Sequence, residues 1–179
     1  MTEDFLLLNP GPVPITDEVS AAMDAPMVSH RSAAFEAVYE RTQEGLDDVF
    51  EASTLDGTTT ATDAGGTSLL LNGTASMGME AAVANLVGAG DHVVALVNGK
   101  FGRRFARIAE RYADVTRVEV PWGDSIPLSD VDAAITDDTD LVTMVHNETS
   151  TGLLNPVAGV GRIADDHDAR FVVDGVTSI

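Results

Sequence analysis

The sequence predicts an α/β domain with a mostly parallel sheet and helices on both of its faces. From Thr67 onward, short apolar runs rich in Val and Leu alternate with segments whose apolar residues recur at helical spacing. The helical segments end in turn signals such as Gly88-Ala89-Gly90-Asp91. The composition is globular, with 44% hydrophobic residues and dispersed acidic residues. Strand–helix alternation of this kind favours parallel strands covered by helices on both sides.

The first expected elements are an arm and two helices. Residues 9–14 contain three prolines, which exclude a helix there. Thr16 is expected to cap a helix over residues 17–24, because the acidic residues that follow it suit a positive first turn. A longer helix is expected over about residues 33–50, and the Thr- and Gly-rich stretch 57–66 is expected to be a loop.

The remaining expected elements form the alternating part of the chain. The candidate strands are Ser68–Leu71, His92–Val97, Val115–Val120, Leu141–His146 and Phe171–Val173. The candidate helices are Ser76–Val87, Gly102–Tyr112, Leu128–Ile135 and Val157–Asp166. Before the last helix, Asn155 is expected to be an N-cap and Pro156 the first helical residue.

The charge balance restricts the possible partners. Against 29 Asp and Glu there are only 10 Lys and Arg, so the net charge of −19 opposes binding to nucleic acid or to anionic membranes. Such a surface resembles those of halophilic proteins, in which salt screens self-repulsion, and we expect the fold to loosen at low salt. No cysteine is present, which excludes disulfides and thiolate chemistry. The acidic start and the lack of a long apolar stretch predict a cytoplasmic protein.

Four loops at expected carboxyl ends of strands carry unusual residues, and ligands bind at such ends. In the first loop, residues 72–80 form a small-residue turn into a helix that could direct N–H groups at a phosphate. Alternatively, Thr74 or Ser76 only caps that helix. Nucleotide-binding fingerprints are absent, which disfavours a nucleotide-binding α/β domain.

The second loop places an aromatic residue between two glycines. Phe101 could stack on a flat ligand, or it could anchor the following helix in the core. Lys100 is the only lysine of the chain and therefore the only residue able to form an imine through an ε-amine. A solvated surface lysine is the commoner case.

The third and fourth loops are polar after apolar strands. Residues 146–152, of sequence His-Asn-Glu-Thr-Ser-Thr-Gly, offer many hydrogen-bonding groups to a ligand, although Ser and Thr are also ordinary turn residues. A histidine at the end of a strand, such as His146, is more often hydrogen-bonded within the fold than catalytic. No metal-ligand spacing accompanies it. Asp174 either caps the following turn or pairs with a protonated heterocyclic nitrogen that keeps it ionised.

In this order and spacing, the loops resemble the large domain of fold-type I pyridoxal phosphate enzymes. The resemblance is to the N-terminal portion of class V aminotransferases of the alanine–glyoxylate/serine–pyruvate type, and it covers nearly the whole chain. The motifs that carry it are Leu8-Asn9-Pro10-Gly11-Pro12, His30-Arg31-Ser32, Met79-Glu80-Ala81-Ala82, Asn98-Gly99-Lys100-Phe101-Gly102-Arg103, residues 146–152 and Val173-Asp174-Gly175-Val176.

The resemblance implies pyridoxal 5'-phosphate as the cofactor. The resemblance implies that Thr74, Ala75 and Ser76 bind the cofactor phosphate, and that Phe101 stacks on the ring with Val176 on the opposite face. It implies that Thr149 contacts the ring hydroxyl and that the catalytic Asp174 pairs with the pyridine nitrogen. Pro10 and Gly11 would lie near the substrate. A fixed carboxylate at the nitrogen would keep the ring an electron acceptor when the substrate Cα–H bond breaks.

The resemblance also implies how the chain is divided. Residues 1–31 would form an arm and the first helix, residues 32–179 part of the cofactor-binding domain, and the small C-terminal domain would be absent. The Schiff-base lysine would lie beyond Ile179, so we expect the chain alone to be inactive. The intact protein is expected to be a homodimer.

The implied reaction transfers an amino group from alanine or serine to glyoxylate or another 2-oxo acid. Alternatives are 2-aminoethylphosphonate–pyruvate aminotransferase, a class V lyase or desulfurase, and a non-catalytic truncated or split product. Desulfurases of this family typically stack a histidine where Phe101 stands, which favours an aminotransferase.

Overall fold

The computed structural model describes residues 10–51 and 68–178, so the loop expected at residues 57–66 lies outside the described residues. The described residues form two compact units, one of residues 10–51 and 68–70 and one of residues 71–178. The division predicted between residues 31 and 32 stays a prediction. No helix in the described ranges is long and apolar enough to cross a membrane.

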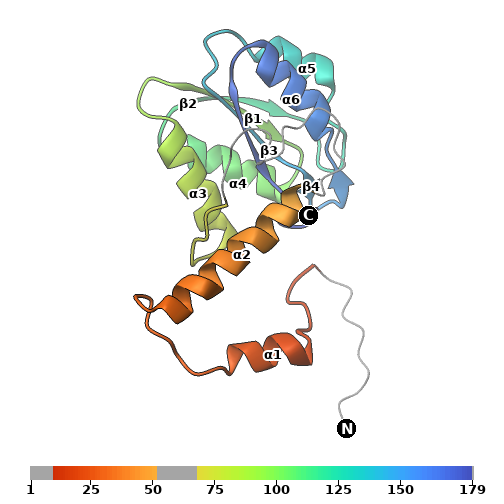
Figure 1. Cartoon of the computed structure of the whole chain (residues 1–179). Helices are drawn as coiled ribbons and strands as arrows, with labels where there is room; N and C mark the ends of the chain where they lie inside the picture. Colours follow the sequence, from red (N-terminus) through yellow and green to blue (C-terminus); the bar gives the residue numbers. More distant parts are fainter. Residues whose placement is uncertain (1–9, 52–67, 179) are drawn as a thin grey trace. The chain divides into compact units, whose positions relative to one another are not determined.

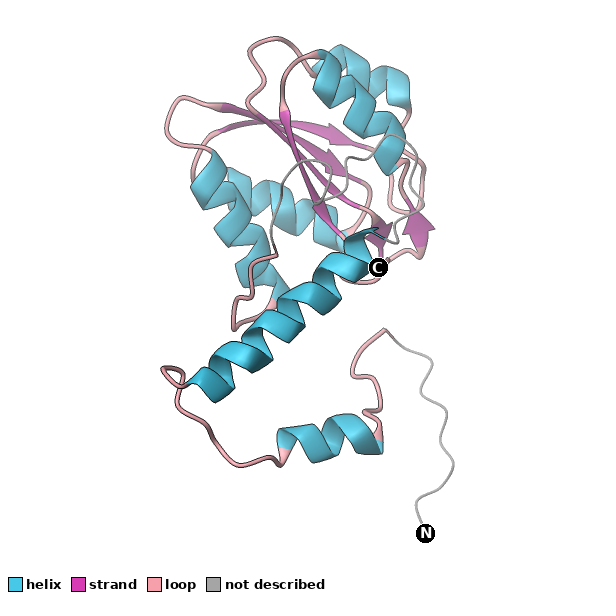
Figure 2. Ribbon diagram, viewed as in Figure 1, coloured by secondary structure: helices cyan, strands magenta, loops and turns pink. Residues whose placement is uncertain are grey.

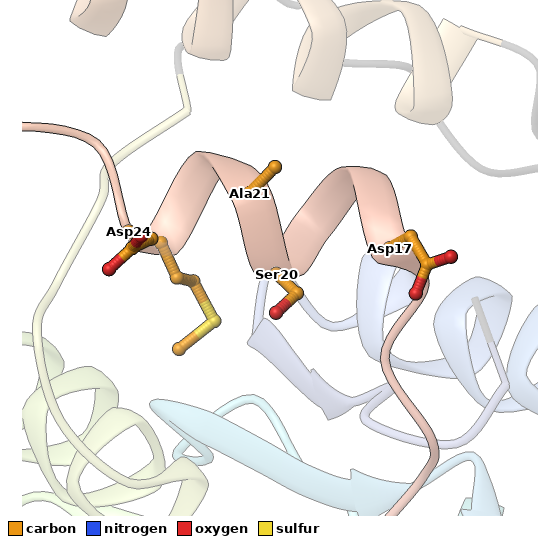
Figure 3. A pocket seen from close by; sticks show the side chains of 5 residues that line it. Asp17, Ser20, Ala21 and Asp24 are labelled. Atoms are coloured by element: carbon orange, nitrogen blue, oxygen red, sulfur yellow. The ribbon is translucent and has the colours of Figure 1, made fainter.

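The first unit contains the helices α1 (Asp17–Met23) and α2 (Ala33–Glu51), drawn in Figure 2. As predicted, Thr16 caps α1, because its hydroxyl accepts a hydrogen bond from the Val19 N–H at 3.3 Å. α1 has no buried residue. The hollow beside it is lined by Asp17, Ser20, Ala21, Met23 and Asp24, all from this helix and its C-cap (Figure 3).

The prediction of a strand at Ser68–Leu71 is wrong, because this segment is an irregular loop. Leu69 and Leu71 are 77% and 61% exposed. A strand needs a neighbour for its N–H and C=O groups, and no strand of the described residues pairs with this one. Ser68 is instead held by α2: its hydroxyl donates to Asp47 Oδ1 at 2.6 Å, and its carbonyl accepts from Gln43 Nε2 at 2.9 Å.

The second unit is built on a four-stranded parallel sheet of order β2-β1-β3-β6. Its strands are β1 (His92–Val97), β2 (Asp114–Glu119), β3 (Leu141–Val145) and β6 (Arg170–Asp174), close to the predicted ranges. The central strands β1 and β3 are almost completely buried, as their unbroken apolar sequences predict for a sheet covered on both faces.

Helices cover both faces of this sheet, as predicted (Figure 1). α3 (Ala75–Leu86) and α4 (Lys100–Ala109) pack on one face, and α5 (Leu128–Ala134) and α6 (Val157–Asp166) pack on the other. Successive side chains of β1 point to opposite faces of the sheet, so the core has two parts. Val93 packs in the cluster with Phe105 of α4, and Val94 packs in the cluster with Val131 of α5.

The two central strands separate towards their carboxyl ends. β1 pairs with β2 along its whole length, but with β3 only from Val93–Leu141 to Ala95–Thr143. The chain leaves β1 towards β2 on one side and returns to β3 on the other. Such a reversal of strand order is where open α/β sheets bind ligands. A short antiparallel hairpin, β4 (Asn147–Glu148) and β5 (Leu153–Leu154), follows β3 and was not predicted.

Candidate functional site

The N-terminus of α3 provides free backbone donors. Thr74 is its N-cap, with the hydroxyl accepting from the Met77 N–H at 3.3 Å, so of the two capping candidates the structure selects Thr74. The N–H groups of Ala75 and Ser76 have no acceptor among the described residues. Two free N–H groups at the positive end of a 12-residue helix suit an anionic group such as a phosphate.

Arg104 joins this helix start to the aromatic residue of the second loop. Its Nη1 donates to Ser76 Oγ at 2.8 Å, and its Cζ lies 5.1 Å from the centroid of the Phe101 ring. Because Ser76 Oγ accepts this hydrogen bond, its own proton remains available to an anion. The exposed Lys100 places its ammonium 5.7 Å from the same centroid.

The ring of Phe101 anchors the start of α4 in the core, whereas its stacking on a ligand stays a prediction. It packs against the core cluster that α3 and α4 form on the sheet, yet it remains partly exposed. A ring anchored in this way can present its remaining surface to a planar ligand.

Glu148, in the hairpin that follows β3, binds the start of α4, which follows β1; no separate role was predicted for this residue. It is fully buried, and its Oε2 accepts from the N–H groups of Phe101 at 3.0 Å and Gly102 at 2.9 Å. Its Oε1 accepts from the Ser150 hydroxyl at 2.6 Å and the Ser150 N–H at 3.2 Å. A buried carboxylate is stable in this position because N–H donors and a helix N-terminus surround it.

This carboxylate explains why α4 begins two residues earlier than predicted, at Lys100 instead of Gly102. Helix starts read from a sequence depend on a local cap, and Gly99 offers no side chain. The cap comes from the distant hairpin instead: Glu148 takes two N–H groups, and Ser150 Oγ accepts the Lys100 N–H at 2.9 Å. Since the chain itself supplies the anion at the start of α4, these N–H groups are not available to a ligand phosphate.

A second polar pair, Asn98 and Asn155, also joins the segments that follow β1 and β3, and it corrects another prediction. Asn155 does not cap α6, which begins at Val157 without a side-chain cap. Its amide points inward, where Nδ2 donates to the Val145 carbonyl at 2.8 Å and Oδ1 accepts from Asn98 Nδ2 at 2.8 Å. Buried polar groups at this point outweigh a local cap because they would otherwise lack partners.

The third and fourth loops meet beside the end of β6. Thr149 Oγ1 and Thr177 Oγ1 share a hydrogen bond at 2.9 Å, and Asn147 Nδ2 donates to Thr177 Oγ1 at 3.1 Å. Thr177 had not been singled out from the sequence. The partly buried Asp174 accepts from the Val176 N–H at 3.1 Å through Oδ1, while Oδ2 has no donor among the described residues. One carboxylate oxygen is therefore held in the turn, and the other can accept from a ligand.

The other predicted residues are less constrained. Val176 is 67% exposed, and Pro10 and Gly11 are exposed in the first unit, so the roles of all three stay predictions. Burial lowers the pKa of His146, which favours its neutral form. In the described part of the chain, no group of three or more His, Asp or Glu side chains could hold a metal ion.

Comparison with known proteins gives concordant matches. Residues 6–179 match the family described as aminotransferase class-V. The chain is 35% identical to L-aspartate–glyoxylate aminotransferase of Paracoccus denitrificans and 30% identical to 2-aminoethylphosphonate–pyruvate transaminase of Vibrio cholerae, covering 100% and 99% of this chain. The crystal structure of alanine–glyoxylate aminotransferase from Nostoc superposes on 99% of the chain with a TM-score of 0.82 and 32% identity.

These matches cover less than half of each relative. The chain spans 44% of the Paracoccus protein, 47% of the Vibrio protein and 46% of the Nostoc chain. The parallel α/β fold is thus that of the N-terminal part of the relatives' large domain.

Proposed function

The chain belongs to the class V aminotransferase family, and on that premise we propose that the whole protein transfers an amino group from alanine or serine to glyoxylate or another 2-oxo acid. The proposed cofactor is pyridoxal 5'-phosphate. We also propose that the protein is a cytoplasmic homodimer that binds neither nucleic acid nor membranes, in keeping with its net charge of −19.

The observation that carries this proposal is the connection through Arg104. It links the free N–H groups and hydroxyl at the start of α3 to the partly exposed ring of Phe101. A phosphate attached to a planar heterocycle needs this pairing of an anion site with an aromatic surface. The guanidinium adds a positive charge beside Ser76, in a chain where acidic residues outnumber basic ones. The residues present therefore fit the cofactor.

Asp174 carries the electrostatic part of the chemistry. When bound, the cofactor supplies an electron acceptor for breaking the substrate Cα–H bond. The Val176 N–H holds one oxygen of Asp174, and the other oxygen is left to hold a proton on the ring nitrogen. Thr149, fixed by Thr177, would offer its hydroxyl to the ring hydroxyl.

The covalent step needs a lysine, which we place outside these 179 residues. Lys100, the only lysine, is exposed at the first position of α4. The chain by itself is therefore proposed to be inactive. Reductive trapping of pyridoxal phosphate on the protein would locate the imine, and labelling of Lys100 would contradict this assignment.

The test of the proposed chemistry is Asp174→Asn in the naturally occurring protein. The variant keeps the shape and loses the charge, so cofactor should still bind while the rate of amino transfer falls about a hundredfold. Asp132→Asn, a matched change on the exposed side of α5, should leave the rate unchanged. Near-normal turnover of D174N would refute the role of Asp174.

A second candidate reaction follows from the similarity to the Vibrio cholerae transaminase. Assays with alanine, serine and 2-aminoethylphosphonate as donors, each with glyoxylate and pyruvate, separate the two reactions. A class V lyase or desulfurase would cleave the substrate without forming a new amino acid. Absence of all turnover in the natural protein, with cofactor supplied, would favour a non-catalytic truncated or split product.

A further inference from the structure

We propose that Glu148 is a positioning residue that sets the distance between Phe101 and Thr149, the two side chains assigned to the cofactor ring. This inference rests on the proposed function. Glu148 is not assigned to the cofactor itself, because it is fully buried and both of its oxygens already accept hydrogen bonds from the chain. Its effect on the ring must therefore pass through the residues that it holds.

The carboxylate joins two segments that are distant in the sequence. Oε2 binds the Phe101 and Gly102 N–H groups, which fixes the backbone that carries the Phe101 ring. Oε1 binds the N–H and hydroxyl of Ser150, which fixes the turn that begins at Thr149. The same Ser150 hydroxyl accepts the Lys100 N–H at 2.9 Å, so the first turn of α4 is bound to the hairpin at three successive N–H groups.

The packing leaves this junction little freedom to move. A Cβ on Gly99 would collide with the side chain of Glu148, and a Cβ on Gly102 would lie 2.9 Å from the Leu96 carbonyl oxygen. The two glycines thus let α4 approach both the carboxylate and strand β1 closely. With its backbone held there, the Phe101 ring is further oriented by the Arg104 guanidinium.

The chemistry of the site requires a carboxylate and not an amide. Both oxygens accept hydrogen bonds: Oε2 from the Phe101 and Gly102 N–H groups, and Oε1 from Ser150 and, at 3.3 Å, also from the Phe101 N–H. A glutamine has a single acceptor oxygen, and its NH₂ group would face either the α4 N–H groups or the Ser150 N–H. Glu148→Gln is therefore nearly isosteric but breaks one half of the junction. Phe101 and Thr149 should then no longer be held at one distance.

The experiment compares Glu148→Gln with Glu80→Gln in the naturally occurring protein. Glu80 of α3 binds the turn that follows the C-terminal end of α4, through the Tyr112 hydroxyl at 2.9 Å and Arg111 at 3.1 Å. The readouts are the dissociation constant of pyridoxal phosphate, the visible circular dichroism of the bound cofactor, and amide hydrogen exchange in cofactor-free protein. We expect E148Q to raise the dissociation constant about tenfold. It should also change the dichroism and speed exchange at the Phe101 and Gly102 amides, while E80Q changes none of these.

The outcomes separate this inference from the proposed function. Wild-type protein that binds no pyridoxal phosphate overturns both. Wild-type protein that binds it, together with E148Q of unchanged affinity and dichroism, overturns the role of Glu148 alone. If E148Q does not fold, Ser150→Ala serves instead, because it keeps the charge of Glu148 and removes the hydroxyl that donates to Oε1 and accepts the Lys100 N–H. A changed dichroism in S150A supports the junction, and an unchanged one overturns it.

Discussion

Gly102→Ala tests how closely α4 packs on the sheet. The new Cβ would lie 2.9 Å from the Leu96 carbonyl oxygen, 3.2 Å from Val97 Cα and 3.8 Å from Glu148 Oε2. Carbon–oxygen contacts in proteins are seldom closer than about 3.3 Å, so α4 would have to retreat by roughly 0.4 Å. The obstacle is the backbone of the buried strand β1, which cannot turn away as a flexible side chain would.

The magnitude follows from two opposed effects. Overpacking of this kind costs about 1 to 3 kcal/mol. Replacing a helical glycine by alanine returns about 1 kcal/mol of helix propensity. The net expectation for G102A is a loss of about 1 kcal/mol in the free energy of unfolding.

The same substitution elsewhere supplies the control. Gly78 of α3 has no heavy atom within 4 Å of its added Cβ, so G78A should gain about 0.5 to 1 kcal/mol. Gly161 of α6 would make an ordinary contact at 3.6 Å with the Phe171 ring, and G161A should also stabilise. Urea unfolding of the three variants measures the order, because a shift of midpoint at constant slope reports stability. G102A as stable as G78A would refute the argument.

Further expectations concern buried polar groups and charge. Among the described residues, Thr143 Oγ1 is buried without a hydrogen-bond partner, so Thr143→Val should raise the free energy of unfolding by about 1 kcal/mol in the same assay; a loss would reveal a missed partner. Asn155→Ala removes a hydrogen-bond partner from the Val145 carbonyl and from the Asn98 amide, and it should lower the free energy of unfolding by about 2 kcal/mol. Burial lowers the pKa of His146 below its ordinary 6.5. The contribution of neutral His146 to stability is therefore present above pH 6.5 and is lost as the pH falls through the folded-state pKa. His146→Asn should flatten that part of a profile of unfolding free energy against pH. The melting temperature should rise from low to molar salt, given the net charge of −19, and an unchanged melting curve would contradict this.

Part of the candidate site was predictable because its signals are local. Thr74 capping the start of a helix, and Phe101 between two glycines, are patterns of a few adjacent residues. Asp174 was likewise expected at a strand end and is found at the end of β6. The structure connects Ser76 to Phe101 through Arg104, whereas the roles of these residues toward the cofactor stay predictions.

The sequence by itself determined the α/β class, the helices and four of the five expected strands, since hydrophobic periodicity and caps depend on neighbours in the chain. Only the tertiary structure decided the strand order, the absence of a strand at Ser68–Leu71, and the roles of Glu148 and Asn155. Each of these depends on a partner far away in sequence: Glu148 binds N–H groups 46 and 47 residues before it, and Asn155 pairs with a residue 57 positions away. A buried polar group takes whichever donor the fold brings to it, because leaving it unpaired costs more than a local cap contributes.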